Sequence, residues 1–287
     1  MLRTARVYGG GDACFFRQSL RGGAKNGGNG GGGRDMKAYK GFDKNMRCRG
    51  YQFAEGETYV HDGPLSLCES GFHACQDPVD CLRYYDPCTS VYHEVEIDGV
   101  SDEREGDTKV VGKKIRIGAR IGIAEMVKAS VDLTFAACRD AENADAASGD
   151  GSRQSASGDG SRQAASGGWS IQSARGNNSI QAASGGWSIQ SASGHASRQA
   201  ASGGWSIQSA SGNNSIQAAS GDGSRQAASG RESSQVASGH ASRQVASGDT
   251  SSQETTGKNC VMMSAGNSGK ARGKIGSWIV LTEWVDG

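Results

Sequence analysis

The stretch SGGWSIQSARGNNSIQAASGGWSIQSASG, residues 166–194, repeats itself on two scales. A nine-residue unit, Ser-Gly-x-x-Ser-x-Gln-x-Ala, recurs throughout it, whereas Trp returns only after eighteen residues. A fixed short period of this kind is the signature of a stacked array. Ser-Gly, or a close variant, opens further units at residues 148, 157, 166, 175, 184, 193, 202, 211, 220, 229, 238 and 247.

Within the unit, positions 5 and 7 hold Ser and Gln almost throughout, whereas positions 6 and 8 vary. This alternation has a period of two and predicts a short β-strand at positions 5–8, with Ser and Gln on one side. Gly at position 2 is expected to let the chain turn with a positive φ. One strand and one corner cannot close a coil, but two can. We therefore predict an all-β, two-sheet solenoid in which two units, or eighteen residues, make one coil.

The fixed Ser, Gln and Ala positions are expected to point inward, where every polar group needs a partner. Stacked Gln side chains can pair amide to amide along the axis, so Gln154, Gln163, Gln172 and their equivalents should form ladders. The opposite orientation, with Ile inward and Gln outward, is the alternative. Arg at position 6 argues against it in five units: Arg153, Arg162, Arg198, Arg225 and Arg243.

With position 6 outward, one sheet carries an apolar strip with basic ends, and the Trp residues lie beside it. We expect this strip to be exposed and to bind either a protein partner or a second copy of the chain. The alternative is that the Trp rings only cover a corner of the solenoid. The candidate binding residues are Trp169, Ile171, Trp187, Ile189, Trp205 and Ile207.

The composition of the whole chain limits its partners and its compartment. The formal net charge of +1 gives no electrostatic reason to expect nucleic acid or an anionic membrane as partner. No run of about 18 apolar residues predicts a transmembrane helix, and the start lacks the apolar core of a secretion signal. We therefore expect a cytosolic protein, with its cysteines reduced.

Four segments follow from the pattern. Residues 1–35 end in a Gly-rich tract and are expected to be a disordered leader. Residues 36–138 are predicted to form a small α+β head domain, residues 139–273 the solenoid, and residues 274–287 a cap.

Inside the head domain, MKAYKGF, SVYHEVEI and TKVVGKKIRIG are each predicted to be a strand. DPVDCLRYY should be a short helix capped by Asp77, with Pro78 in its first turn. AEMVKASVDLTFAAC fits either a helix or the first irregular coils of the array.

The cysteines of the head domain do not follow a metal-binding pattern. Cys68, His73, Cys75, Cys81 and Cys88 are close in sequence but contain no Cys-x-x-Cys pair. We expect buried structural thiols rather than a zinc site, and no cofactor. A Walker motif and a Gly-x-Ser-x-Gly motif are also missing from the sequence.

The unit GDGSRQAASG, residues 158–167, is similar to the repeats of bacterial ice-nucleation proteins. The shared Gly, Ser, Gln and Ala imply a related solenoid. The outward Thr-x-Thr pairs of that family are absent, so an ice-binding function is the less favoured alternative. RTX calcium rolls also use nonapeptides, but this unit lacks the Asp that would supply their oxygen ligands.

The front half resembles an uncharacterised domain of bacteriophages and prophages. The matching stretches are MKAYKGFDKNMRCRGYQFAEGETY (36–59), LCESGFHACQDPVDCLRYY (67–85) and YHEVE (92–96). In that family a Ser-Gly-rich nonapeptide tail often follows and ends in a segment like residues 257–284. The resemblance implies a phage or mobile-element origin, a location in the host-cell cytoplasm or on the virion, and no established activity. It favours an accessory binding or structural protein that displays a rigid solenoid surface.

An enzyme is the alternative. The order of Tyr-Lys-Gly-Phe, Gly-Phe-His, a helix and the acidic strand YHEVE is distantly similar to ADP-ribosyltransferase-like folds. In those folds an early strand and a later Glu frame the nicotinamide pocket. The resemblance makes Tyr39, His73 and Glu94 or Glu96 candidate catalytic residues, with the solenoid as a targeting module.

Overall fold

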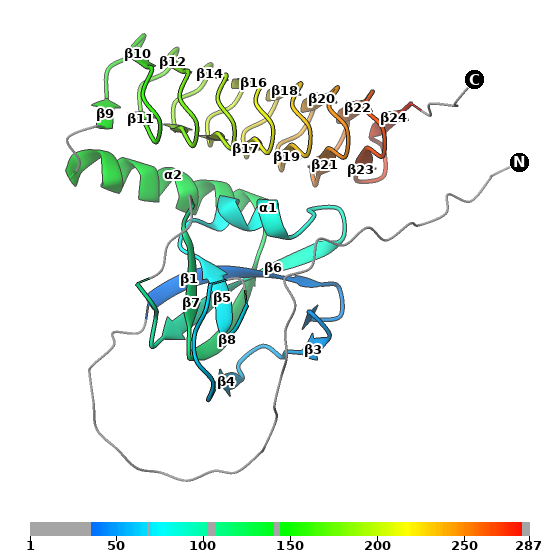
Figure 1. The fold of residues 1–287 in the computed structure, drawn as a ribbon. Coiled ribbons are helices and arrows are strands. Elements are labelled where there is room, and N and C mark those ends of the chain that lie inside the picture. Colours follow the sequence, from blue (N-terminus) through cyan, green and yellow to red (C-terminus); the bar gives the residue numbers. More distant parts are fainter. Residues whose placement is uncertain (1–35, 68, 103–106, 141–143, 283–287) are drawn as a thin grey trace, which may run out of the picture.

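A head domain lies along one side of a β-solenoid in the computed structural model, which describes residues 36–67, 69–102, 107–140 and 144–282 (Figure 1). The head is a mixed α/β domain, and the solenoid is an all-β array with two parallel sheets. The predicted fold class is confirmed. The leader expected at residues 1–35 lies outside the described residues.

A six-stranded antiparallel sheet forms the body of the head, in the order β4-β8-β6-β1-β5-β7. The central strands β1 and β6 pair along their whole length, from Met36 opposite Ile97 to Asp43 opposite Ser90. One face of the sheet packs into an apolar cluster around Phe42, Ile97 and Ile115. The strands of the head are β1 Met36–Asp43, β2 Arg47–Cys48, β3 Tyr51–Gln52, β4 Thr58–Val60, β5 Phe72–Cys75, β6 Ser90–Asp98, β7 Lys109–Gly112 and β8 Lys114–Ile121.

The segment TKVVGKKIRIG is not one strand, as predicted, but two. β7 ends at Gly112 and β8 begins at Lys114, and they lie at separated positions of the sheet. The single residue between them, Lys113, donates its N–H to Asp98 O and accepts from His61 N–H at 2.9 and 2.7 Å. The sheet is therefore curved, so that the edge strand β7 and strand β8, near the opposite edge, come together at Lys113. Alternation within the segment predicts extended backbone but not which neighbours it takes.

Two helical segments connect the head to the solenoid. Asp77 caps the first, as predicted, by accepting a hydrogen bond from Val79 N–H at 3.0 Å. It consists of the 3-10 turn η1 Pro78–Asp80 and helix α1 Cys81–Tyr84. The second segment, which the sequence left open between helix and coils, is helix α2 Ile123–Asp140. It runs along the solenoid axis and contacts one of the two solenoid sheets, on the strands from β9 to β19 (Figure 1).

Two parallel eight-stranded sheets make up the solenoid, and their strands alternate along the chain. We call them the outer sheet and the docked sheet, because the head packs on the second one. In-register pairs such as Gln172 with Gln190, which are eighteen positions apart in the sequence, confirm the predicted coil length.

The outer sheet is made of β10 Arg153–Ala156, β12 Ile171–Ala174, β14 Ile189–Ala192, β16 Ile207–Ala210, β18 Arg225–Ala228, β20 Arg243–Ala246, β22 Val261–Ser264 and β24 Trp278–Leu281. The docked sheet is made of β9 Ala144–Ala147, β11 Arg162–Ala165, β13 Ile180–Ala183, β15 Arg198–Ala201, β17 Ile216–Ala219, β19 Ser234–Ala237, β21 Ser252–Thr255 and β23 Lys270–Arg272.

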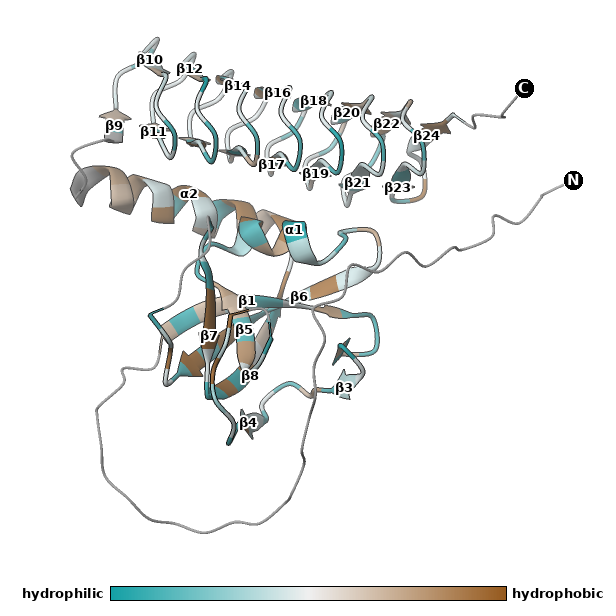
Figure 2. Ribbon diagram, in the orientation of Figure 1, coloured by the Kyte–Doolittle hydropathy of each residue, from teal (hydrophilic) through white to brown (hydrophobic). Residues whose placement is uncertain are grey.

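The interior of the solenoid is polar and fully paired over its middle coils. Gln172 Nε2 donates to Gln154 Oε1 one coil earlier at 2.9 Å, and to the carbonyl of Ala182 in the opposite sheet at 3.0 Å. Ser170 Oγ donates to Gly167 O at 2.7 Å. The same contacts recur coil after coil, so the predicted inward Gln ladders are confirmed. Figure 2 shows the contrast with the head, where hydrophobic residues concentrate in the sheet and in α2.

Gly at position 2 does not have the predicted role. Its φ is not positive; the left-handed residue is the one at position 4, for example Asn178 at φ 55°. Position 2 is glycine because successive coils touch there. A Cβ on Gly185 would lie 2.1 Å from Gly167 O, whereas one on Gly186 would have no atom nearer than 3.4 Å. The constraint is therefore close approach of backbone to backbone.

Side chains at position 3 also bind successive coils together. Asp150 Oδ1 accepts a hydrogen bond from Gly168 N–H at 2.8 Å, and Asn177 Oδ1 accepts one from His195 N–H at 2.9 Å. These carboxylate and amide oxygens thus satisfy corner N–H groups that the strands leave unpaired.

The segment expected to act as a cap contributes β24, which pairs with β22 in parallel register. Its outward residues are Trp278 and Val280, and all four residues of the strand are exposed. Residues 283–287, the rest of that segment, lie outside the described residues.

The two adjacent glycines test the close approach of the coils. Gly185→Ala should lower the free energy of unfolding by about 3 kcal/mol or more, because its Cβ must displace backbone. Gly186→Ala, one residue away, should change it by less than about 1 kcal/mol. Urea denaturation followed by circular dichroism measures both values. Equal effects of the two variants would contradict this account.

Candidate interaction surface

Three Trp side chains form a continuous stack at one corner of the outer sheet. The ring centroids of Trp169 and Trp187 are 5.0 Å apart with planes 7° apart, and those of Trp187 and Trp205 are 5.3 Å apart with planes 9° apart. The exposed fractions of the three residues are 62, 48 and 49%. All three occupy position 4 with φ between 57° and 59°, a conformation that costs a non-glycine residue roughly 1 kcal/mol.

Ile residues extend this stack onto the outer sheet. Ile171, Ile189 and Ile207 are in-register neighbours on three adjacent strands. Ile189 and Ile207 are exposed, and Ile171 is half-buried. Together with Trp169, Trp187 and Trp205 they form what we call the Trp/Ile surface. It lies on the sheet that faces away from the head (Figure 1).

Arginines flank the Trp/Ile surface on the same sheet. The register places Arg153 one strand before Ile171, and Arg225 and Arg243 on the two strands after Ile207. All three are exposed. In the part of the chain that the structure describes, none of them has a carboxylate partner. From β10 to β24, outward positions 6 and 8 hold no Asp or Glu: Arg153, Ser155, Ile171, Ser173, Ile189, Ser191, Ile207, Ser209, Arg225, Ala227, Arg243, Val245, Val261, Met263, Trp278 and Val280.

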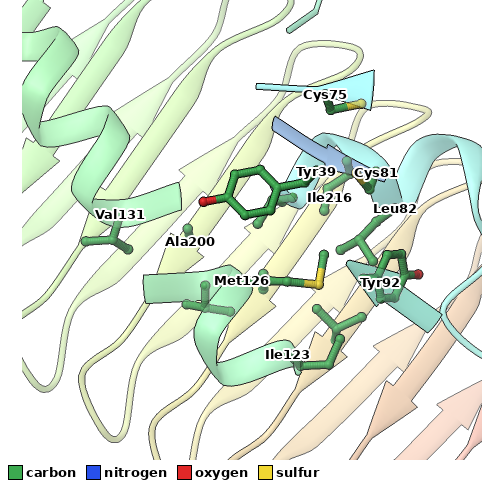
Figure 3. Packing of buried hydrophobic residues seen from close by; sticks show 14 of the residues in the cluster. Tyr39, Cys75, Cys81, Leu82, Tyr92, Ile123, Met126, Val131, Ala200 and Ile216 are labelled. Atoms are coloured by element: carbon green, nitrogen blue, oxygen red, sulfur yellow. The ribbon is translucent and has the colours of Figure 1, made fainter. Parts of the chain in front are cut away.

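The outward face of the docked sheet, by contrast, is buried under the head. Ile216 and Ala218 join an apolar cluster with Met126 of α2 and with Leu82 and Tyr39 of the head. Figure 3 shows Tyr39 and Met126 directed toward the strands that carry Ala200 and Ile216. The sequence analysis missed this contact. Its signal was position 8, which is Ala or Val on the middle strands of the docked sheet and Ser on the facing strands of the outer sheet: Ala164, Ala182, Ala200, Ala218 and Val236 against Ser155, Ser173, Ser191 and Ser209.

A buried arginine fixes the head on the docked sheet. Arg198 forms ion pairs with Asp80 and, at 3.3 Å, with Asp77 Oδ2. Asp77 also accepts from Ser130 Oγ of α2 at 3.0 Å. Burial raises the pKa of the Asp77 carboxyl, and the Arg198 guanidinium opposes that rise. Arg198 therefore gives this apolar contact one specific position along the solenoid.

A third carboxyl, Glu254, lies where the last coils meet the head. It contacts Arg272 at 3.2 Å and lines an open cavity of about 340 Å³ with Arg120, Ile121 and Tyr92. Burial raises the pKa of Glu254 to about 7, and Arg272 opposes the rise. Glu254 thus changes charge in the physiological range inside the contact between head and solenoid.

The four candidate catalytic residues lie on the head sheet, and two of them face each other. Tyr39 of β1 is the cross-strand partner of Glu94 of β6. Tyr39 is buried within the contact to the solenoid, and burial raises its pKa. Glu94 pairs with Lys37 at 2.8 Å, and Glu96 with Arg116 at 3.3 Å.

His73 lies on β5, two residues from Cys75, which is the partner of Tyr39. Burial, with the nearby charge of Lys40, lowers its pKa to about 4, so its imidazole is neutral at pH 7. A cavity of about 220 Å³ near this sheet is lined by other residues: Lys44, Met46, Glu55, Val91, His93 and Arg120. The geometry thus pairs Tyr39 with Glu94 across two strands, and none of the four candidate catalytic residues lines either this cavity or the one beside Glu254.

The cysteines are free thiols where they are described. Cys75, Cys81, Cys138 and Cys260 are buried, and Cys48 and Cys88 are partly buried. Burial raises the pKa of Cys88 to about 12. Among the described residues no three His, Cys, Asp or Glu side chains are placed to hold a metal ion. Cys68, which belonged to the sequence cluster, lies outside the described residues.

Comparison with known proteins identifies only the head. Residues 36–129 match the family described as Domain of unknown function (DUF7666). The chain carries a DUF7666 domain. No curated protein and no solved structure matches the chain. The DUF7666 domain spans the head sheet and the first part of α2, so it includes most of the residues that hold the solenoid.

Removal of the buried cation should destabilise the contact between the DUF7666 domain and the solenoid. Arg198→Met leaves two buried carboxylates without a partner and should lower the free energy of unfolding by about 3 kcal/mol. The triple variant Arg198→Met/Asp77→Asn/Asp80→Asn should recover most of that loss. Urea denaturation at pH 7 measures it, with Arg162→Met, at an exposed position 6, as control. A single variant that costs less than about 1 kcal/mol would show that the ion pairs do not hold the contact.

Glu254 should make the stability depend on pH. Its carboxyl keeps a proton in the folded chain up to about pH 7 but loses it near pH 4.5 in the unfolded chain. Its contribution is therefore largest below pH 4.5 and is lost as the pH rises through 7, by at most about 3 kcal/mol. Relative to Glu254→Gln, the wild type should lose stability between pH 4.5 and 7 in thermal unfolding. Parallel pH profiles of the two proteins would contradict the assignment; Glu232→Gln, at an exposed corner, serves as control.

Proposed function

We propose that this protein is an accessory binding or structural protein, in which the DUF7666 domain holds a rigid β-solenoid and the solenoid displays the Trp/Ile surface to a protein partner or to a second copy. The observation that carries the proposal is the stack of three half-exposed Trp rings on the sheet that faces away from the head. Contiguous exposed apolar surface of this kind is typical of interaction sites.

The distribution of apolar residues supports this division of roles. The docked sheet uses its outward Ile and Ala residues against α2 and the rest of the head. The outer sheet has the same backbone but exposes Ile189 and Ile207 and leaves Ile171 half-buried. One face of the solenoid therefore has its partner within the chain, and the other face remains available.

We further propose a phage or prophage origin, with the protein in the host-cell cytoplasm or associated with the virion. The supporting observation is the resemblance of residues 36–59, 67–85 and 257–284 to the phage-associated pattern. In the described part of the chain, no helix combines the length and apolarity needed to cross a bilayer.

Replacement of Trp169, Trp187 and Trp205 by Ser should leave the solenoid folded, because the Gln ladders lie inside. It should abolish assembly through the outer sheet, measured as the loss of a dimer or of partner binding in sedimentation velocity. Asn178→Ser/Asn214→Ser, at the same unit position of the opposite corner, is the matched control and should assemble like the wild type.

Two results would count against the proposal. If the triple variant unfolds, the Trp rings belong to the core of the solenoid. If it assembles like the wild type, the docking surface lies elsewhere. Circular dichroism on the same samples separates the two results.

A further inference from the structure

Given the proposed function, we infer that the outer sheet binds an acidic amphipathic helix of a partner protein. The helix would have an apolar face and carboxylates separated by about the length of four solenoid coils. The Trp/Ile surface supplies the apolar centre. Arg153 at one end, and Arg225 and Arg243 at the other, supply exposed cations without a carboxylate partner in the described chain.

The docked sheet shows, within the same molecule, what such a surface binds. There, too, an arginine at position 6 lies in register between isoleucines, with Ile180 before Arg198 and Ile216 after it. The head covers Ile216 with apolar side chains and meets the guanidinium with Asp77 and Asp80, and Ile180 is buried as well. The outer sheet repeats this combination of Ile and Arg on the same backbone, so the same partner chemistry fits it.

The internal contact also favours a helix, because α2 supplies apolar residues to it, while Asp77 and Asp80 are the cap and the last residue of η1. α2 lies along the solenoid axis and crosses six successive strands of the docked sheet, from β9 to β19. On the outer sheet, Arg153 and Arg225 are separated by four coils, or about 19 Å. A helix rises 1.5 Å per residue, so carboxylates about 11 to 15 residues apart on one face would reach both arginines.

The same charges argue against a second copy as the occupant. In a two-fold dimer centred on Ile189, either Arg153 meets the partner's Arg153 or it meets the partner's Arg225, depending on the direction of the axis. The outward positions of the sheet hold no carboxylate that could compensate. Both arrangements therefore place like charges together while they desolvate them, which is unfavourable. An anionic partner removes this repulsion.

The test uses the full chain and two synthetic peptides of about 20 residues, a length that gives a helix of roughly 30 Å. Both have one Leu-rich face; one carries Glu at two positions about 14 residues, or four helical turns, apart on that face, and the other carries Lys there. Fluorescence anisotropy of the labelled peptides gives the affinities, and Trp emission reports contact with the Trp/Ile surface. We expect the Glu peptide to bind at least tenfold more tightly than the Lys peptide, and more weakly as salt increases.

Charge reversal assigns the contact to named residues. Arg153→Glu/Arg225→Glu should weaken the binding of the Glu peptide at least tenfold, and the variant should then prefer the Lys peptide. Arg162→Glu changes an exposed arginine at the same unit position of the docked sheet and should leave the preference unchanged. Circular dichroism verifies that each variant is folded.

Several results would overturn the inference. The first is a Glu peptide that binds no better than the Lys peptide. The second is tighter binding to phosphatidylglycerol vesicles or to duplex DNA than to the Glu peptide, and the third is a wild-type dimer that Arg153→Glu/Arg225→Glu leaves intact. If the charge preference fails while the triple Trp→Ser variant still abolishes an assembly, only the acidic helix is wrong. If both fail, the proposed function fails with it.

Discussion

The interior of the solenoid depends on the two hydrogen bonds that each buried Gln amide, from Gln172 to Gln253, donates. One goes to the Gln one coil earlier and holds coils in register; the other crosses the interior and joins the two sheets. Buried amides are costly unless paired, so the ladder requires the same residue at the same place in every coil. The ladder ends where a coil lacks this Gln. Gln244 and Gln253 are followed one coil later by Met262 and Ala271, which cannot donate, and their Oε1 atoms lack partners among the described residues.

A core of Ser, Gln and Ala buries little apolar surface, so the solenoid takes part of its hydrophobic stabilisation from outside. The docked sheet obtains it from the head, through Ile216, Met126 and the residues around them. Arg198 makes that contact specific, because its guanidinium must meet Asp77 and Asp80 when it is buried. The head and the docked sheet therefore share one apolar cluster, so a substitution in one of them should also lower the stability of the other.

The repeat was predictable because its constraints are local and periodic. Ser170 and Gln172 alternate with variable positions, which fixes the strand, and Trp recurs in every second unit, which fixes the coil. The role of Gly185 was not predictable, since close approach and a positive φ require the same residue. The docking of the head was also missed, because Ala182 and Ala200 are small residues whose burial becomes apparent only when the two sheets are compared. For Tyr39 and Glu94, the resemblance made both residues site candidates, but it indicated neither that they are cross-strand partners nor that the solenoid covers Tyr39.

The two sheets of the solenoid thus have different surroundings: the head covers the docked sheet, whereas the outer sheet is exposed. The Trp residues show this difference most clearly. Position 4 needs a left-handed residue, which Asn178 and Gly223 provide at less cost than Trp does. Trp187 adopts this unfavourable conformation and is about half exposed, and its ring stacks on those of Trp169 and Trp205. The stack contributes some stability, but Asn at the same position of the opposite corner supports the same coil geometry. The coil geometry alone therefore does not require an indole at three successive coils, and the binding role proposed for this surface is what would favour one.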